Sequence, residues 1–255
     1  MEYNNKALAD IAMISVIKNE EDIIYYNLIW HYNIGIRKFI IMDNMSTDST
    51  YQMVKIFRDR FTDVSLYLID DQNPAFIQGT KMTSMANFAM SMWDIKWIIP
   101  IDADEFLCPS KPLNELLSEV PKNHSLLISK LFYRLCDDSN GVFYKRIEKR
   151  EKISQWSKKV IIRAAEGLLI SQGNHTSFVN NVEVPTVEST NIIYREFMIR
   201  NKTQYFNKII NGAIATKKAL ELKYEAGSNH WLAPYNEYLK GGKESLSKIF
   251  EIYIN

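Results

Sequence analysis

Three carboxylates follow an apolar run near the middle of this 255-residue chain. The run begins at Trp97 and reads W-I-I-P-I-D-A-D-E-F-L-C-P, so Asp102, Asp104 and Glu105 fall close together. Clustered carboxylates repel one another and lose hydration unless a cation or hydrogen-bond donors compensate. Magnesium is commonly bound through one or two carboxylates together with substrate phosphates, and manganese accepts similar oxygen ligands. The stretch predicts a site for a metal-bound diphosphate; an acidic helix start or a solvated turn is the alternative.

The elements that would position these carboxylates alternate through the first half of the chain. Apolar runs predict strands over residues 11–17, 38–42, 64–69 and 97–101. The stretches between them predict helices that end near residues 33, 60 and 93. Strands and helices that alternate with short connections are typical of a parallel sheet covered by helices on both faces.

Polar clusters follow three of these predicted strands. Lys18-Asn19-Glu20 follows the first strand, Asp43-Asn44 the second, and the stretch from Asp102 to Glu105 the fourth. In open α/β sheets, ligands bind beyond the carboxyl ends of the strands. We therefore expect one shared site at this edge. No Gly-rich dinucleotide or phosphate-loop motif accompanies it, which argues against a Rossmann dehydrogenase or an NTPase.

The second half is less regular but carries further polar groups. Residues 145–163 hold eight basic side chains against two acidic ones. Such a run is ordinarily a solvated face; beside a diphosphate site it would suit an anionic donor or a lipid-phosphate acceptor. Gly173-Asn174-His175 reads as a loop that offers an imidazole. Residues 200–222 read as a helix, on which Arg200, Gln204 and Lys208 would share one face.

Composition limits the classes of function. A net charge of +1 and a pI near 7.7 argue against a general nucleic-acid binder. Cys108 and Cys136 fit no zinc or redox spacing, which is consistent with a reducing compartment. The amino-terminal residues lack the features of a signal peptide, and no apolar run reaches the length of a membrane span. We expect a cytoplasmic protein, with peripheral contact at the inner face of a membrane left open.

Taken in order, the motifs resemble bacterial glycosyltransferases of the family 2 type with the GT-A fold, including the group related to family 92. The resemblance covers roughly residues 10 to 215. It is carried by K-N-E-E-D-I-I from Lys18, N-L-I-W-H-Y-N-I-G from Asn27, D-N-M-S-T-D-S-T from Asp43, D-A-D-E-F from Asp102, G-N-H from Gly173 and R-N-K-T-Q-Y-F-N-K-I-I-N-G from Arg200.

The resemblance implies a GT-A-like α/β fold with a mostly parallel sheet flanked by helices. The length of the chain and the lack of a clear linker predict a single glycosyltransferase domain over residues 1–255, in which about 10–108 would bind the nucleotide-sugar and 109–255 would form the acceptor half and C-terminal helices. The implied reaction is the transfer, with inversion, of a sugar from a UDP-sugar or related donor to a glycan or lipid-linked acceptor hydroxyl. A divalent metal, Mn²⁺ or Mg²⁺, would assist, and the product would be a bacterial surface glycan such as lipopolysaccharide or capsule.

The matching motifs also suggest individual roles. Asp104 would bind the metal, with His175 as a further ligand or diphosphate contact, and Asp43 would contact the base or ribose. The residues assigned to the nucleotide-sugar are Lys18, Glu20, Asp43, Asp102, Arg200 and Lys208. One departure stands out, because relatives often carry His-Phe-Pro before the arginine and this chain has Glu196-Phe197-Met198.

An acceptor hydroxyl needs a general base, ordinarily a carboxylate. The candidates after the metal strand are Asp137, Asp138, Glu148 and Glu166, of which Asp138 and Glu148 stand first. Glu105 is also possible, but it lies close to the expected metal, whose positive charge would depress its basicity. Two other functions remain open: a non-catalytic relative that binds carbohydrate or nucleotide, and a nucleotidyltransferase. The first has no need of three clustered carboxylates, and the second would carry a Gly-rich basic loop where Lys18-Asn19-Glu20 stands.

Overall fold

The computed structural model describes residues 7–75, 77–135, 147–150, 154–224 and 229–254. The chain is divided into two compact units. The first unit consists of Met1–Asn73, Gln78–Lys130 and Ser154–Arg195. The second unit consists of Pro74–Ile77, Leu131–Ile153 and Glu196–Asn255.

Two sheets are present among the described residues. The larger has nine strands, in the order β3-β2-β1-β4-β8-β6-β12-β5, with β7 paired to β6. Its strands are β1 (Leu8–Ile17), β2 (Ile36–Asp43), β3 (Ser65–Asp70), β4 (Trp97–Pro100), β5 (Glu105–Pro109), β6 (Ser125–Leu135), β7 (Ile147–Arg150), β8 (Ser154–Arg163) and β12 (Thr186–Glu196). The smaller sheet joins β9 (Leu168–Ile170), β10 (Ser177–Val179) and β11 (Val182–Glu183).

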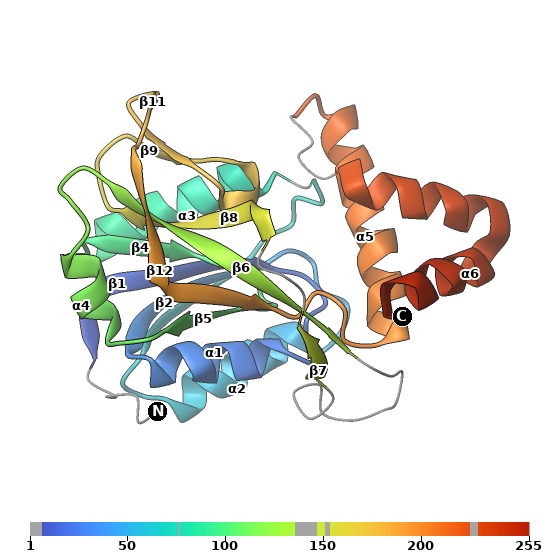
Figure 1. Ribbon diagram of the computed structural model, residues 1–255, viewed down its shortest axis with the longest axis horizontal. Helices are drawn as coiled ribbons and strands as arrows, with labels where there is room; N and C mark the ends of the chain where they lie inside the picture. The colour runs from blue at the N-terminus through green and yellow to red at the C-terminus, as the bar shows by residue number, and fades with distance from the viewer. Residues whose placement is uncertain (1–6, 76, 136–146, 151–153, 225–228, 255) are drawn as a thin grey trace. The chain divides into compact units, whose positions relative to one another are not determined.

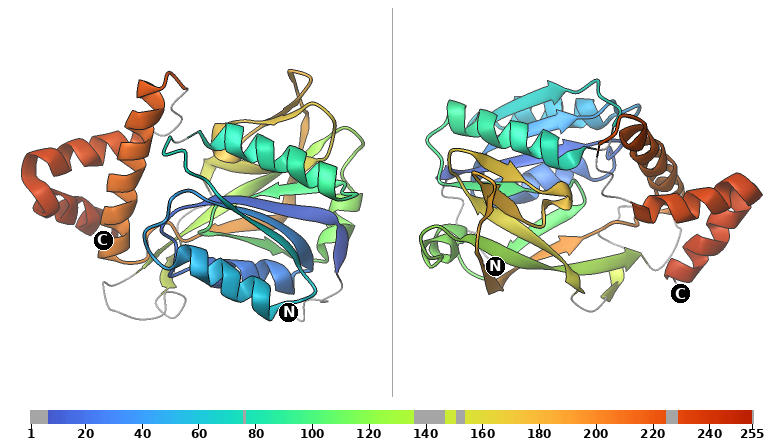
Figure 2. Two further views of the ribbon diagram at one scale, coloured as in Figure 1. Left: turned by 180° about the vertical axis from the view of Figure 1, so that it is seen from behind. Right: turned by 90° about the horizontal axis from the view of Figure 1, so that it is seen from above.

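Helices cover both faces of the parallel strands. In the first unit they are α1 (Ile24–Asn33), α2 (Thr50–Arg60), α3 (Gln78–Met92), α4 (Leu113–Ser118) and the 3₁₀ turn η2 (Gln172–Asn174). Helices α1 and α2 lie on one face of the β1–β2 region, and α3 lies on the other (Figures 1 and 2). This layering, with β3, β2, β1 and β4 mutually parallel, confirms the predicted α/β fold.

Alternating apolar side chains explain why the sheet is covered twice. In β1, Met13 and Ile17 belong to the core shared with α1 and α2, whereas Ala12 and Ile14 belong to the core shared with α3. Successive side chains of a strand point to opposite faces, so a continuous apolar run implies burial on both. Beyond β4 the strand pairing becomes antiparallel, because β4 pairs with β8 and β8 pairs with β6 in that orientation.

The second unit has its own small core. Helix α5 (Lys202–Glu221), the turn η3 (Asn229–Trp231) and α6 (Leu232–Ile254) pack around Tyr205, Phe206, Ile209, Leu246 and Phe250. Gly242 breaks α6 with a positive φ of 62°. No helix in the described part of the chain is long and apolar enough to cross a membrane.

Candidate functional site at the carboxyl edge of the parallel strands

The loops that follow β1 and β2 are hydrogen-bonded to each other. The Lys18 ammonium group donates to the carbonyl oxygen of Asn44 at 3.0 Å. The backbone amide of Asn19 donates to Ser46 Oγ at 3.0 Å, and the amide of Thr47 donates to Asn19 Oδ1 at 2.7 Å. Asn19 has a φ of 55°, in the left-handed region that asparagine tolerates. The polar clusters predicted after the first two strands therefore form one interlocked structure.

Asp43 is the last residue of β2 and is buried, with 4% of its surface exposed. Its backbone is paired with Ile17 of β1, and its carboxylate accepts a hydrogen bond from the Ser46 hydroxyl. Burial raises the pKa of Asp43 above its ordinary value, against the opposing effect of Ser46. Nearby, the backbone amide of Glu20 donates to Thr50 Oγ1 at 2.7 Å. The structure thus brings Lys18, Glu20 and Asp43 together, as predicted.

A second polar cluster adjoins this loop pair. The Asn44 amide donates to Asp71 Oδ2 at 2.8 Å, and Lys81 of α3 forms an ion pair with the same carboxylate. Burial, and then repulsion from Lys81, lower the pKa of Lys18, while Asp43 and Asp71 act in the opposite direction. Asp71 and Lys81 were not among the predicted site residues. A carboxylate directly after the third parallel strand was the available signal.

The three carboxylates after β4 lie in the same unit, beside β1. Asp104 is 3% exposed and Glu105 is fully buried. Asp102 accepts a hydrogen bond from Gln78 Nε2 at 2.6 Å and forms an ion pair with Lys159 Nζ at 2.8 Å. Because β4 lies directly next to β1 in the sheet, these carboxylates and the two interlocked loops share one edge.

Side chains of helix α1 form hydrogen bonds with the backbone of β5, the strand that begins at Glu105. Asn27 Nδ2 donates to the carbonyl of Glu105 at 2.6 Å, and Trp30 Nε1 donates to the carbonyl of Leu107 at 2.7 Å. The amide of Leu107 in turn donates to His31 Nε2 at 3.3 Å, while His31 Nδ1 donates to Asn27 O at 2.8 Å. Burial lowers the pKa of His31 to about 4, so the ring is neutral. His31 therefore packs in α1 as a neutral ring and accepts a hydrogen bond from β5.

His175 lies near the same carboxylates. Its Nδ1 donates to the carbonyl of Lys158 at 2.7 Å, which leaves Nε2 as the acceptor atom of a neutral ring. Burial lowers the pKa of His175; the charges of Lys159 and Asp102 also act on it, in opposite directions. Gly173 has a φ of 80°, and a Cβ atom there would lie 2.6 Å from His175 Nε2. The predicted G-N-H loop therefore needs its glycine to make room for the imidazole.

Other predicted residues lie elsewhere. Arg200 and Lys208 belong to the second unit, and Arg200 is fully buried. The prediction that Arg200 lies on a helix is wrong, because α5 begins at Lys202 after the N-cap Asn201. Asp138 lies outside the described residues, and for Glu148 only the backbone in β7 is described. Their assigned roles stay predictions.

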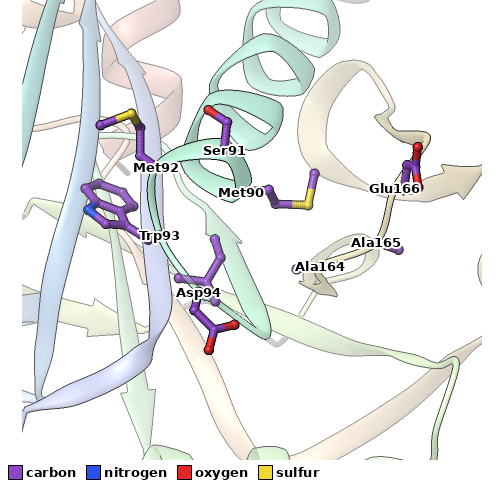
Figure 3. Close-up of a pocket in the computed structure, with 9 residues that line it drawn as sticks. Met90, Ser91, Met92, Trp93, Asp94, Ala164, Ala165 and Glu166 are labelled. Atoms are coloured by element: carbon purple, nitrogen blue, oxygen red, sulfur yellow. The ribbon is translucent and has the colours of Figure 1, made fainter.

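Glu166 is not at this edge of the sheet. It lines an open hollow of about 450 Å³, together with Met90, Ser91, Met92, Trp93, Asp94, Ile95, Ala164 and Ala165. Met90 extends from the end of α3 towards the loop that carries Glu166 (Figure 3). Because Arg163 pairs with Trp97, the first residue of β4, this hollow lies at the amino end of that strand. Glu166 is therefore excluded as a base for chemistry at the carboxyl edge.

No set of three or more His, Cys, Asp or Glu side chains is placed to hold a metal ion within the described part of the chain. Magnesium and similar cations commonly need only one or two carboxylates when substrate phosphates supply further oxygens. A site in which Asp104 is the carboxylate ligand would be of that kind, because protein ligands alone would not complete the coordination shell.

No protein-family model matches this sequence, and no curated protein sequence matches it. Solved structures with related backbones include a mannosyltransferase, PcManGT from Pyrobaculum calidifontis, in complex with GDP-Man and Mn²⁺. It is 12% identical, with a TM-score of 0.42, over 93% of this chain and 72% of that chain. HddC from Yersinia pseudotuberculosis is 8% identical, with a TM-score of 0.41, over 77% of this chain and 96% of that chain.

The bifunctional glycosyltransferase WbbM in its apo form is 13% identical to this chain. Its TM-score is 0.32, and the match covers 49% of this chain and 25% of that chain. Identities this low, with TM-scores below 0.5, say nothing of the chemistry of this chain. The function is therefore argued from its own residues.

Proposed function

We propose that this chain is a divalent-metal-dependent glycosyltransferase that moves a sugar from a nucleotide-sugar donor to an acceptor hydroxyl. One observation carries the proposal. The interlocked loops after β1 and β2 and the carboxylates after β4 gather at one edge of the parallel strands. Ligands of open α/β sheets bind at this edge. A nucleotide-sugar has a hydrogen-bonding nucleoside at one end and a metal-binding diphosphate at the other, which matches this division of groups.

Each group has a distinct task under this proposal. Asp43, buried and rich in acceptor oxygens, accepts hydrogen bonds from the N–H groups of a base or from ribose hydroxyls. Lys18 and Glu20 support the same nucleoside end. Asp104 would hold the cation, and the neutral Nε2 of His175 suits either the cation or a diphosphate contact. When bound, the cation supplies Lewis-acid stabilisation of the departing diphosphate.

Finer features of the proposal rest on the sequence resemblance. They are a UDP-sugar donor, an inverting reaction, a glycan or lipid-linked acceptor and a product that belongs to a bacterial surface glycan. In an inverting reaction a carboxylate takes the proton of the acceptor hydroxyl on the face opposite the leaving group. Asp138 and Glu148 are the candidates for that base. Arg200 and Lys208 are proposed phosphate contacts, and a peripheral membrane contact would bring a lipid-linked acceptor to the enzyme.

The first test is Asp104→Ala, with Asp94→Ala as the matched control, because Asp94 lies at the opposite end of β4 in the hollow of Figure 3. Melting temperatures are measured with a panel of nucleoside diphosphates, with and without Mn²⁺. A ligand at about 100 times its Kd stabilises by about 2.7 kcal/mol, which corresponds to roughly 5–10 °C for a chain of this size.

The wild type and Asp94→Ala should show this metal-dependent rise with one nucleotide, and Asp104→Ala should not. With the matching nucleotide-sugar, product analysis should show release of a nucleoside diphosphate. Release of pyrophosphate from a nucleoside triphosphate and a sugar phosphate would instead identify a nucleotidyltransferase. If no nucleotide raised the melting temperature of the wild type, the glycosyltransferase proposal would be refuted and a carbohydrate-binding protein would be favoured.

A further inference from the structure

Met45, in the loop after β2, has a backbone conformation that methionine rarely adopts. Its φ is 58°, in the left-handed region where a Cβ atom crowds the following carbonyl oxygen. In the described part of the chain, the other non-glycine residues with positive φ are asparagines, which tolerate this region, with the single exception of Lys223. A glycine at this position would have no Cβ atom to crowd. The methionine is therefore held in a strained conformation.

The turn at Met45 is imposed by hydrogen bonds on each side of it. Before it, the amide of Asn44 donates to the last carbonyl oxygen of β1 at 2.8 Å. After it, Ser46 Oγ accepts from the amide of Asn19 and donates to the Asp43 carboxylate. Strained residues persist where the surrounding structure fixes them, and they gather at ligand sites.

Met45 is also exposed, with 39% of its surface accessible. It is the only apolar residue in the two interlocked loops, residues 18–22 and 44–49. A single exposed apolar side chain on a protein surface is ordinary. At Met45, however, exposure coincides with a strained backbone. Neither packing in the core nor backbone preference therefore accounts for a methionine at this position.

The position of Met45 indicates what its side chain would contact. The residue lies between Asn44 and Ser46, and Ser46 is bonded to Asp43, the proposed partner of the base or ribose. A nucleobase has a polar edge and two apolar faces. Carboxylate, amide and hydroxyl groups can bind the edge but give no apolar surface to a face. The thioether of methionine is polarizable and makes favourable contacts with aromatic rings.

We propose that Met45 is a base-contacting residue, whose side chain packs against one face of the nucleobase while Asp43 binds the polar edge or the ribose. This inference rests on the proposed function. The contact acts on the nucleoside end of the donor and not on its diphosphate. Because every base has an apolar face, Met45 contributes affinity, and the choice of base is left to the hydrogen-bonding groups.

The experiment measures affinities in Mn²⁺ by isothermal titration calorimetry. The probes are UDP, GDP, CDP and ADP, and pyrophosphate, which has the diphosphate but no base. Met45→Gly and Met45→Asn both suit the left-handed backbone and both remove the apolar side chain. Each should weaken the nucleotide that the wild type prefers about fivefold, equivalent to about 1 kcal/mol, and leave pyrophosphate binding within about twofold. Met45→Leu keeps an apolar side chain and should bind the nucleotide within about twofold of the wild type.

Lys223→Gly is the matched control, because Lys223 has a φ of 59° but belongs to the second unit. It relieves the same kind of strain and should leave the affinity for every probe unchanged. Met45→Asn should not lower the melting temperature of the ligand-free protein, since asparagine tolerates this φ. A lower melting temperature would show that Met45 packs for stability and would overturn the inference.

Two other results would also overturn the assignment of Met45 to the base. One is an equal loss of nucleotide and pyrophosphate affinity in Met45→Asn, because the loop would then act on the diphosphate. The other is nucleotide binding by both Met45→Gly and Met45→Asn that is as tight as in the wild type. The glycosyltransferase proposal would stand in either case. A wild type that binds none of the probes would overturn both.

Discussion

Acid should loosen the attachment of α1 to β5, because His31 can hold that attachment only while it is neutral. Its side chain is fully buried, and its Nε2 accepts a hydrogen bond from the amide of Leu107. A second proton on the ring would occupy that acceptor and bury a positive charge. Burial accordingly lowers the pKa of His31 from 6.5 to about 4.

The sign and size of the effect follow from the pKa shift. The folded-state pKa lies below the unfolded value, so the stabilisation is complete above pH 6.5 and is lost as the pH falls towards about 4. At about 1.4 kcal/mol per unit, the shift corresponds to about 3 kcal/mol of unfolding free energy. This is a large part of the stability of an ordinary domain, which is about 5–15 kcal/mol.

The perturbation is His31→Gln, which retains a donor and an acceptor but has no proton to gain. Urea unfolding of the wild type and the variant is followed between pH 7.5 and pH 4. The wild type should lose about 3 kcal/mol more than the variant over this range, since carboxylate titration is common to both. His124→Gln, at a half-buried turn histidine, should follow the wild type. If the unfolding free energies of the wild type and His31→Gln fell in parallel with pH, the lowered pKa of His31 would be refuted.

Two glycine substitutions test how the G-N-H loop and α3 are held. Gly79→Ala would place its Cβ 2.8 Å from a backbone oxygen of β9, and should lower the unfolding free energy by about 1–3 kcal/mol in urea melts. Ser84→Ala, at an exposed site on the same helix, is the control and should be nearly neutral. Gly173→Ala should cost about 1–2 kcal/mol for its positive φ and more from the clash with His175. In a His175→Ala background only the backbone part should remain; an unchanged cost there would contradict the clash.

The parallel half of the fold was predictable because its signals are local. Each of its strands is an apolar run, and Lys18, Asp43 and Asp102 lie at or just after strand ends. In a parallel sheet all such ends meet at one edge, so order along the chain was enough to predict proximity. The start of α5 could also have been predicted from the sequence. Asn201 accepts from the amide of Gln204, and Asn followed three residues later by Gln is a known helix-start signal.

The lysines that pair with the carboxylates of the site could not be predicted from the sequence, because their positions depend on the register of antiparallel strands. Lys159 is 57 residues from Asp102 along the chain, and nothing in the neighbouring sequence distinguishes it from the other lysines of the basic run. A shift of β8 by one residue would turn its side chain to the other face of the sheet. Such long-range pairs are fixed only when the whole sheet has formed.

This dependence on register has a consequence for the chemistry. The carboxylates that follow β4 form ion pairs with lysines of β6 and β8, so neither half of the sheet alone can hold the fully buried Glu105 in the charged state. Placing Lys159 on β8 therefore makes the burial of a charged Glu105 conditional on the complete sheet.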